Sequence, residues 1–355
     1  MAHKGNNIAG FPGGGRIHGS VDHAEPTHLL DVQRLETHFF TFDGVARAVD
    51  DVSFHLDRGE VLGIVGESGC GKSVTAQSVM RLIPEPPGRI VGGRILFDGL
   101  DLATLSMPSV RGIRGNRIAM IFQEPMTSLN PVFTVGDQIA EMFIQHEGLP
   151  RKAAVQRAVA MLQKVQIPAP ERRIMDYPHQ LSGGMRQRAM IAMALACNPE
   201  ILIADEPTTA LDVTVQAQIL DLMLTLRQDH DTAIIMITHD LGVIAEIASR
   251  VVVMYAGKVV EAARTGDIFK NPKHPYTRGL LQSIPKLGER ARHGRRNLQE
   301  IAGIVPSLYT LPEGCRFYPR CPVRLEKCRE HLPELLDTGG EHAVRCWLHV
   351  KEGQS

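Results

Sequence analysis

The sequence has no excess of either charge, no long apolar run and no apolar leader. Its 355 residues include 39 basic and 39 acidic side chains, for a formal net charge of +0. Balanced charge disfavours a general nucleic-acid binder, which is usually strongly basic. No apolar run reaches the roughly 18 to 20 residues that cross a bilayer as a helix, and residues 1–20 lack the apolar core of a secretion signal. We therefore expect a cytoplasmic chain that neither spans a membrane nor binds nucleic acid.

Cysteine is scarce until the end of the chain. Two of the six cysteines are isolated, and the other four lie close together near the C-terminus: Cys315, Cys321, Cys328 and Cys346. Disulfides rarely persist in a reducing compartment. We therefore interpret the cluster first as a set of metal ligands and only second as bridges.

The hydrophobic pattern predicts three regions. Residues 1–27 are rich in glycine and lack a hydrophobic period, which predicts a flexible tail. Between residues 28 and 285, short apolar runs alternate with helical segments, which predicts an α/β fold with a mostly parallel sheet covered on both faces. Residues 286–330 are rich in proline and basic residues, and we predict a separate, loop-rich extension over residues 286–355. The predicted strands are Val61–Val65, Ile118–Phe122, Ile201–Ala204, Ala233–Ile237 and Val251–Tyr255.

A helical insertion is predicted within this middle region, at about residues 127–196. Val135–Phe143 and Arg151–Val165 have amphipathic spacing, and the segment contains no run that resembles a strand.

A glycine-rich loop follows the first predicted strand. Residues 66–73 read G-E-S-G-C-G-K-S, which matches the phosphate-loop pattern G-x-x-x-x-G-K-S between a strand and a helix. The glycines let successive backbone amides face the phosphates, the lysine contacts the β- and γ-phosphates, and the serine hydroxyl binds Mg²⁺. A chance glycine turn before a helix is the alternative. The predicted nucleotide-binding residues here are Gly66, Ser68, Gly69, Cys70, Gly71, Lys72, Ser73 and Val74.

Two carboxylates end a later apolar strand. Ile201–Ala204 leads into Asp205 and Glu206, at the edge of the sheet where open α/β folds bind ligands. Asp205 is predicted to hold Mg²⁺, and Glu206 to take a proton from the water that attacks the γ-phosphate. An acidic pair at a helix N-terminus is the alternative.

A second anion site lies between these motifs. Residues 181–188 read L-S-G-G-M-R-Q-R and precede a helix-forming segment, a combination that binds anions at a helix N-terminus. Because the chain already has one phosphate loop, we interpret this site as gripping the nucleotide of a facing copy. The run Leu181-Ser182-Gly183-Gly184-Met185 resembles the signature motif of ATP-binding cassette (ABC) ATPases, and the resemblance covers roughly residues 30 to 285.

The resemblance implies a P-loop NTPase core of the RecA-like type and assigns roles to three more residues. Gln123 matches the glutamine that senses Mg²⁺ and the attacking water, so it is expected among both the metal ligands and the catalytic residues. Asp212, in A-L-D at 210–212, is similar to the aspartate that crosses to the facing subunit. His239 matches the catalytic histidine that contacts the γ-phosphate. Taken singly, these residues could also be a surface amide, a helix cap and an ordinary strand-end histidine.

The family also stacks an aromatic ring on adenine. The corresponding loop reads T-F-D-G-V at residues 41–45, so Phe42 is the predicted stacking residue and Phe40 the alternative. Burial in the core is the more ordinary fate of such a phenylalanine.

Two further segments resemble one branch of the family. N-P-K-H-P-Y-T at 271–277, followed by two leucines, and Y-P-H-Q at 177–180 are similar to segments of the ATPase subunits of dipeptide, oligopeptide and nickel importers.

The four clustered cysteines favour a [4Fe–4S] cluster over zinc. Their spacing, C-x5-C-x6-C-x17-C, lacks the paired short spacings of structural zinc sites, whereas a cluster accepts wide and irregular spacing. The tails of similar peptide-importer ATPases resemble cluster-binding modules. Zinc remains the alternative metal. Disulfide bonds remain the alternative to a metal site.

The resemblance therefore implies a peripheral ATPase subunit on the cytoplasmic face of the cell membrane that energises an importer of di- or oligopeptides. Two such subunits, head to tail, enclose two MgATP molecules. The expected partners are a second ATPase subunit, typically a paralogue, two transmembrane permease subunits and an extracytoplasmic peptide-binding protein. A soluble ABC-type ATPase with a metal-dependent regulatory or nucleic-acid-binding tail is the alternative, but the sequence lacks the long coiled coils or tandem cassettes of that class.

Overall fold

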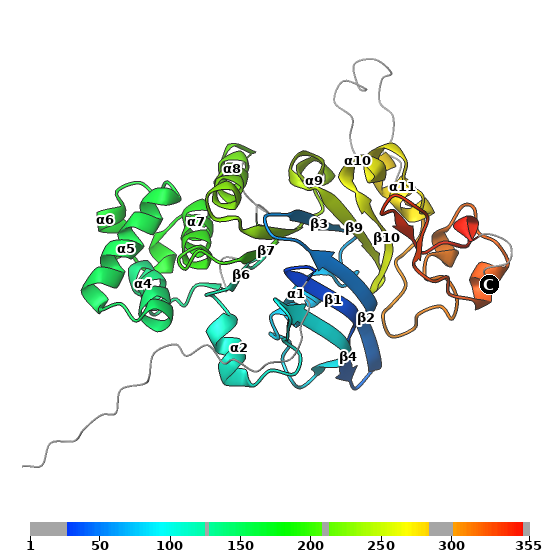
Figure 1. Cartoon of the computed structure of the whole chain (residues 1–355), viewed down its shortest axis with the longest axis horizontal. Coiled ribbons are helices and arrows are strands. Elements are labelled where there is room, and N and C mark those ends of the chain that lie inside the picture. Colours follow the sequence, from blue (N-terminus) through cyan, green and yellow to red (C-terminus); the bar gives the residue numbers. More distant parts are fainter. Residues whose placement is uncertain (1–26, 125–127, 208–212, 284–300, 351–355) are drawn as a thin grey trace, which may run out of the picture.

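The computed structural model describes residues 27–124, 128–207, 213–283 and 301–350. Within these ranges the chain forms two β-sheets, with helices on both sides of the larger sheet (Figure 1). The described residues include no helix that is both long enough and apolar enough to cross a membrane.

The larger sheet has the strand order β11-β12-β10-β9-β3-β8-β7-β6. The five strands from β9 to β6 run parallel, while β10 and β12 are antiparallel to their neighbours. The bounds are β3 (Val61–Val65), β6 (Ile118–Ile121), β7 (Ile201–Asp205), β8 (Ala233–Ile237), β9 (Arg250–Tyr255), β10 (Lys258–Arg264), β11 (Leu336–Asp337) and β12 (Ala343–Val344).

The parallel strands are mostly apolar because both of their faces are buried; the exceptions are Asp205 at the end of β7 and Arg250 at the start of β9. In β3, Leu62 and Ile64 belong to one hydrophobic cluster, and Val61 and Val65 belong to the other. The predicted parallel core is therefore present.

A second, antiparallel sheet covers one face of this core, and the sequence analysis did not predict it. Its order is β2-β1-β4-β5, formed by β1 (Leu30–Thr41), β2 (Gly44–Leu56), β4 (Gly88–Phe97) and β5 (Leu100–Asp101). The expectation of one mostly parallel sheet thus requires a correction. β1 and β2 bury alternate residues instead of forming continuous apolar runs, so a search for such runs misses them.

The helices flank the two sheets. Four of them, α4 to α7, follow β6 and precede β7 along the chain, and they lie at one end of the molecule (Figure 1). The bounds are α1 (Lys72–Val79), α2 (Met107–Ile113), α4 (Val135–Glu147), α5 (Arg151–Lys164), α6 (Pro170–Arg173), α7 (Gly183–Ala194), α8 (Val213–His230), α9 (Leu241–Ile247), α10 (Thr265–Lys270), α11 (Pro275–Gln282) and α13 (Lys327–Glu330), with the 3-10 turns η1 (Pro178–Gln180), η2 (Tyr318–Arg320) and η3 (Trp347–His349).

The C-terminal residues 301–350 lie at the opposite end of the molecule from α4 and α5 (Figure 1). They are joined to the large sheet, because β12 pairs with β10 through Glu261–Val344 and Ala262–Ala343. The interpretation of this extension as a separate appendage is corrected on this point: two short strands of it continue the sheet of the preceding region.

Candidate nucleotide site and cysteine cavity

The phosphate loop connects β3 to α1 with a backbone that needs glycine. Gly66, Gly69 and Gly71 have φ values of 153°, 77° and 101°, where side chains are disfavoured. A Cβ on Gly71 would lie 2.3 Å from the carbonyl oxygen of Ala48. A Cβ on Gly69 would meet nothing within 4 Å, so the loop is open at that point. The loop is therefore packed on one side and accessible on another.

Lys72 is held inside the curl of the loop. Its side chain is buried, and its Nζ donates to the carbonyl oxygens of Gly66 at 2.8 Å and Glu67 at 3.1 Å. The other predicted loop residues, Ser68, Cys70 and Val74, lie around this curl at the β3–α1 junction, and Cys70 is fully buried. Burial raises the pKa of the Cys70 thiol despite the nearby Lys72 charge, so Cys70 acts as a packing residue.

Ser73 and Asp205 meet across the sheet edge. The Ser73 hydroxyl donates to Asp205 Oδ1 at 3.1 Å, and Asp205 is almost fully buried at the end of β7. Burial raises the pKa of the Asp205 carboxyl, and the charge of Glu206 raises it further, against the Ser73 hydrogen bond and Lys72. A buried carboxylate beside a hydroxyl is a pair of hard oxygen ligands that a magnesium ion would stabilise. The donor set therefore fits Mg²⁺.

Glu206 lies at the centre of a second group. Gln123 Nε2 donates to Glu206 Oε2 at 3.0 Å, and His239 Nδ1 lies 3.5 Å from Glu206 Oε1. These residues follow β6, β7 and β8, whose carboxyl ends meet at one edge of the sheet. The structure thus brings together the three residues that the sequence predicts as catalytic.

The backbone of Glu206 is strained. Its φ is 47°, in the left-handed region that costs a non-glycine residue energy, and its N–H donates to the carbonyl oxygen of Ile237 at 2.8 Å. The two adjacent carboxylates contact different partners: Asp205 contacts Ser73, and Glu206 contacts Gln123.

The signature residues lie at the N-terminus of α7. Ser182 caps this helix by accepting a hydrogen bond from the Met185 N–H at 3.3 Å, and Gly183 and Gly184 form its first turn. Ser182 and Gly183 are exposed, and a Cβ on Gly183 would meet nothing within 4 Å. An exposed, capped helix start of this kind is open to an anion outside the chain.

The predicted adenine-stacking residue, Phe42, lies on the β1–β2 hairpin. Phe42 is at the tip of the β1–β2 hairpin and is fully exposed, with a relative accessibility of 105%, and Phe40 is half exposed at 50%. An exposed ring at a hairpin tip is free to stack on a base. The predicted D-loop residue Asp212 lies outside the described residues.

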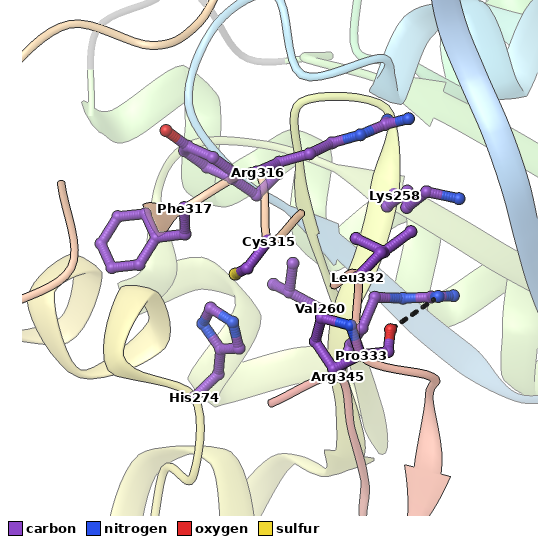
Figure 2. A pocket seen from close by; sticks show the side chains of 10 residues that line it. Lys258, Val260, His274, Cys315, Arg316, Phe317, Leu332, Pro333 and Arg345 are labelled. Carbon is purple, nitrogen blue, oxygen red and sulfur yellow. Dashed lines mark hydrogen bonds between the residues drawn. The ribbon is translucent and has the colours of Figure 1, made fainter. Parts of the chain in front are cut away.

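The four C-terminal cysteines line a common cavity. All four are free thiols, and the other lining residues include His274, Pro275, Phe317, Tyr318, Val323, Trp347 and Leu348. The cavity is small, about 10 Å³, so a cluster would require the loops that line it to move outward. Figure 2 shows the neighbouring pocket, in which the Cys315 side chain points toward His274 while Arg316 extends the other way.

The four thiols of this cavity do not form a compact ligand group in the described part of the chain. Among the described residues, the one group of three or more ligand atoms within 4.8 Å of one another is His28, His55 and Asp57. Sulfurs bound to one zinc ion lie within about 4.6 Å of each other, since each Zn–S bond is about 2.3 Å. In a [4Fe–4S] cube each thiolate binds a different iron and stands farther from the others. All four donors are thiols, which are ligands of both structural zinc and iron–sulfur clusters.

Burial disfavours the thiolate form of three of these cysteines, Cys315, Cys321 and Cys346. It raises the pKa of Cys315 and of Cys346 to about 11, and it also raises the pKa of Cys321. The neighbouring thiols act in the same direction.

One contact of the phosphate loop could not be found from the sequence. The Glu67 N–H donates to the hydroxyl of Tyr276 at 2.8 Å. Tyr276 belongs to the H-P-Y-T segment at 274–277, which resembles a segment of peptide-importer ATPases. Nothing in that segment indicates a contact with Glu67, which lies 209 positions away in the sequence.

Two family models match this chain. The ABC transporter family model matches residues 49–209, and the model of the oligopeptide/dipeptide transporter C-terminal region matches residues 260–328. A solved dimeric ATP-binding cassette in a post-hydrolysis state, bound to ADP and Pi, aligns with a TM-score of 0.61 and 26% identity, covering 66% of this chain and 98% of that chain.

Full-length relatives are more similar still. A probable peptide ABC transporter ATP-binding protein of Sinorhizobium fredii is 56% identical over 319 residues, which cover 90% of this chain and 94% of that protein. The dipeptide transport ATP-binding protein DppD of Bacillus subtilis is 52% identical over 326 residues, covering 92% and 96%. The chain therefore belongs to the ATP-binding, ATP-hydrolysing subunits of the oligopeptide/dipeptide family of ABC transporters.

Proposed function

We propose that this subunit energises a peptide importer by closing on MgATP with a facing ATPase subunit and reopening after hydrolysis. The observation that carries the proposal is the convergence at one sheet edge of Lys72, the Ser73–Asp205 pair and the carboxylate of Glu206. The exposed signature at the start of α7 supplies the second half of a site whose first half lies in the facing subunit.

In this proposal, Glu206 is the general base. Its carboxylate is anchored by Gln123 and approached by His239, which leaves the carboxylate oriented for a water molecule next to the γ-phosphate. Ser73, Asp205 and Gln123 would hold Mg²⁺, which neutralises charge on the phosphates when it is bound. Lys72 leaves its two loop carbonyls to contact the β- and γ-phosphates.

The coupling to transport is conformational. ATP bound between a phosphate loop and a facing signature favours the closed pair, and loss of the γ-phosphate removes that contact, so the pair opens. We assign two permease subunits and an extracytoplasmic peptide-binding protein as the further partners. The ATPase subunit itself is placed at the cytoplasmic face of the membrane. The relatives' names and the matched C-terminal region support a peptide cargo over a soluble ATPase with a nucleic-acid-binding tail.

The Glu206→Gln variant tests the catalytic assignment. We expect it to bind MgATP with wild-type affinity and to hydrolyse it slower by roughly two orders of magnitude or more, because the base is lost and the phosphate cradle is kept. Binding is measured by calorimetry and hydrolysis by phosphate release. Glu246→Gln, an exposed change on α9, is the matched control. Near-normal turnover of Glu206→Gln contradicts the assignment.

We further propose that Cys315, Cys321, Cys328 and Cys346 bind a [4Fe–4S] cluster. Four free thiols that line one cavity support this assignment. A protein purified without oxygen should be brown and contain iron and acid-labile sulfide, and Cys328→Ser should lose both. Cys197→Ser, which changes a cysteine outside the cavity, is the control. Zinc without iron in elemental analysis contradicts the proposal.

A further inference from the structure

The second residue of the phosphate loop is tied to the C-terminal extension by a buried ion pair. Arg320 Nη1 donates to Glu67 Oε2 at 2.6 Å, and Arg320 Nη2 donates to Glu67 Oε1 at 3.0 Å. This two-pronged geometry is the strongest form of an arginine–carboxylate contact. The Arg320 side chain is 4% exposed and that of Glu67 is 28% exposed. The pair therefore has a fixed geometry that water screens weakly.

Arg320 is itself held rigidly. Its remaining donors reach the carbonyl oxygens of Ile301 at 2.9 Å and Ala302 at 3.2 Å, and Nη1 also lies 3.4 Å from the Tyr255 hydroxyl. Arg320 ends η2, which lies between Cys315 and Cys321. An arginine fixed at its backbone and by its other donors can impose a position on the carboxylate that it binds.

Aromatic rings fill the space between the extension and the loop. Phe317 contacts Tyr255 edge-on, with ring centroids 5.2 Å apart, and contacts Tyr276 at 5.5 Å. Tyr276 in turn accepts the hydrogen bond from the Glu67 N–H. The extension thus holds Glu67 at two points: its carboxylate through Arg320 and its backbone through Tyr276 and the ring that supports it.

Glu67 also carries one of the two carbonyl groups that hold Lys72. Lys72 Nζ donates to the Glu67 carbonyl oxygen at 3.1 Å, and the Cys70 N–H donates to the same oxygen at 3.3 Å. A shift of residue 67 would move the first turn of the loop and the resting place of the ammonium group together. The extension therefore reaches the phosphate-binding lysine through a single residue.

We propose that Arg320 is a positioning residue for the phosphate loop, which fixes Glu67 so that the loop amides and Lys72 are held ready for the triphosphate. The proposal rests on the proposed nucleotide site and adds to it a dependence on the C-terminal extension. Arg320 does not touch the nucleotide. Its effect is to preorganise the loop, so its loss lowers nucleotide affinity more than it lowers turnover at saturation.

The test compares full-length variants in nucleotide binding and in steady-state hydrolysis. In Arg320→Ala we expect MgATP and MgADP to bind about tenfold more weakly, KM to rise in parallel and kcat to change by less than about twofold. Arg320→Lys, which keeps the charge and loses the two-pronged contact, should recover part of the affinity. The double variant of Arg320→Ala with Glu67→Gln should bind no more weakly than the weaker single variant, because both changes break the same contact.

Arg264→Ala is the matched control. Arg264 lies on β10 and donates to Glu341 of the extension at 3.0 Å, in an exposed pair away from the loop. We expect it to leave nucleotide affinity unchanged. Wild-type affinity and KM in Arg320→Ala, an equal loss in Arg264→Ala, or fully additive effects in the double variant would overturn the proposal.

Further outcomes distinguish a failure of the Arg320 proposal from a failure of the nucleotide-site assignment. If Arg320→Ala does not fold, Glu67→Gln carries the test, since it preserves the shape of the side chain and removes only its charge; wild-type affinity in Glu67→Gln then overturns the proposal. If wild-type protein does not bind MgATP, the nucleotide-site assignment itself is wrong. If wild-type protein binds MgATP and the variants match it, only the role of Arg320 is wrong.

Discussion

At the scale of single residues, the site depends on groups that are costly unless a ligand is present. Asp205 is buried with one hydroxyl partner, and Glu206 occupies a left-handed backbone conformation at φ 47°. Both features destabilise the empty protein. A cation beside Asp205 would offset the cost of burying its carboxylate.

The identities of these residues were predictable from the sequence, because each follows an apolar strand or a glycine loop. What could not be predicted is which of them touch. The Gln123–Glu206 contact joins residues 83 positions apart, and the Arg320–Glu67 contact joins residues 253 apart. No local pattern records such a pairing, since it depends on the order of the strands and on the path of the extension.

Lys72→Ala should weaken nucleotide binding itself. The ammonium group is the charge closest to the loop carbonyls, and its loss removes the contact with the β- and γ-phosphates. We expect MgATP affinity to fall by at least about tenfold, or about 1.4 kcal/mol. Lys152→Ala, an exposed change on α5, should leave the affinity unchanged. Equal calorimetric affinities of Lys72→Ala and wild type would remove Lys72 from the site.

At the scale of elements, prediction succeeded where burial is symmetrical. The runs Val61–Val65 and Ala233–Ile237 match β3 and β8 to the residue, because a parallel strand covered on both faces is apolar throughout. β1, β2 and β4 were missed for the opposite reason. Their pairing is antiparallel, and polar residues interrupt them on the face that is turned to solvent.

One hydrogen bond between the two sheets requires a neutral histidine. His55 on β2 accepts at Nε2 from Arg250 Nη1 of β9, at 2.7 Å, and Arg250 also donates to Glu60 at 2.6 Å. Burial lowers the pKa of His55, and the charge of Arg250 lowers it further, followed by His28, while Asp57 and Glu60 act in the opposite direction. A proton on Nε2 would face the guanidinium group and break the contact.

Stability should therefore fall on mild acidification, in part through His55. Because the folded pKa is below the unfolded value of 6.5, the unfolded chain binds the proton more readily, and stability present at pH 7.5 is lost as the pH falls below 6.5. We expect His55 to contribute at most about 1 kcal/mol between pH 7.5 and 5.5, because it is only half buried. Urea unfolding at both pH values measures this.

The matched variant is His55→Gln, whose side-chain oxygen can still accept from Arg250 and does not titrate. Other groups contribute equally to both proteins, so the difference in pH dependence isolates His55. The same loss of stability on acidification in wild type and His55→Gln would show that His55 does not carry the effect.

At the scale of the whole molecule, the phosphate loop and the signature segment of one chain lie apart, so each belongs to a different predicted nucleotide site. The phosphate loop, Asp205 and Glu206 are gathered at one sheet edge, while Ser182 and Gly183 start a helix among α4 to α7 and remain exposed. The extension adds a second long-range connection at the other end, where it contacts the phosphate loop and the large sheet. The nucleotide site thus lies between the helices α4 to α7 at one end and the C-terminal extension at the other (Figure 1).

A head-to-tail pair predicts that the signature acts only on the nucleotide of the facing subunit. Ser182→Arg should therefore leave MgATP binding by the single chain unchanged and abolish ATP-dependent pairing, because the added charge and bulk occupy the anion position at the start of α7. The measurement is light scattering in a Glu206→Gln background, in which slow hydrolysis lets the pair accumulate. It is made on the chain alone and on the chain mixed with a paralogous ATPase subunit. Ser106→Arg is the control, since Ser106 caps α2 in the same way and the loss of a cap costs each helix about 1 kcal/mol. Pairing that survives Ser182→Arg, or that is lost equally in Ser106→Arg, contradicts the head-to-tail arrangement.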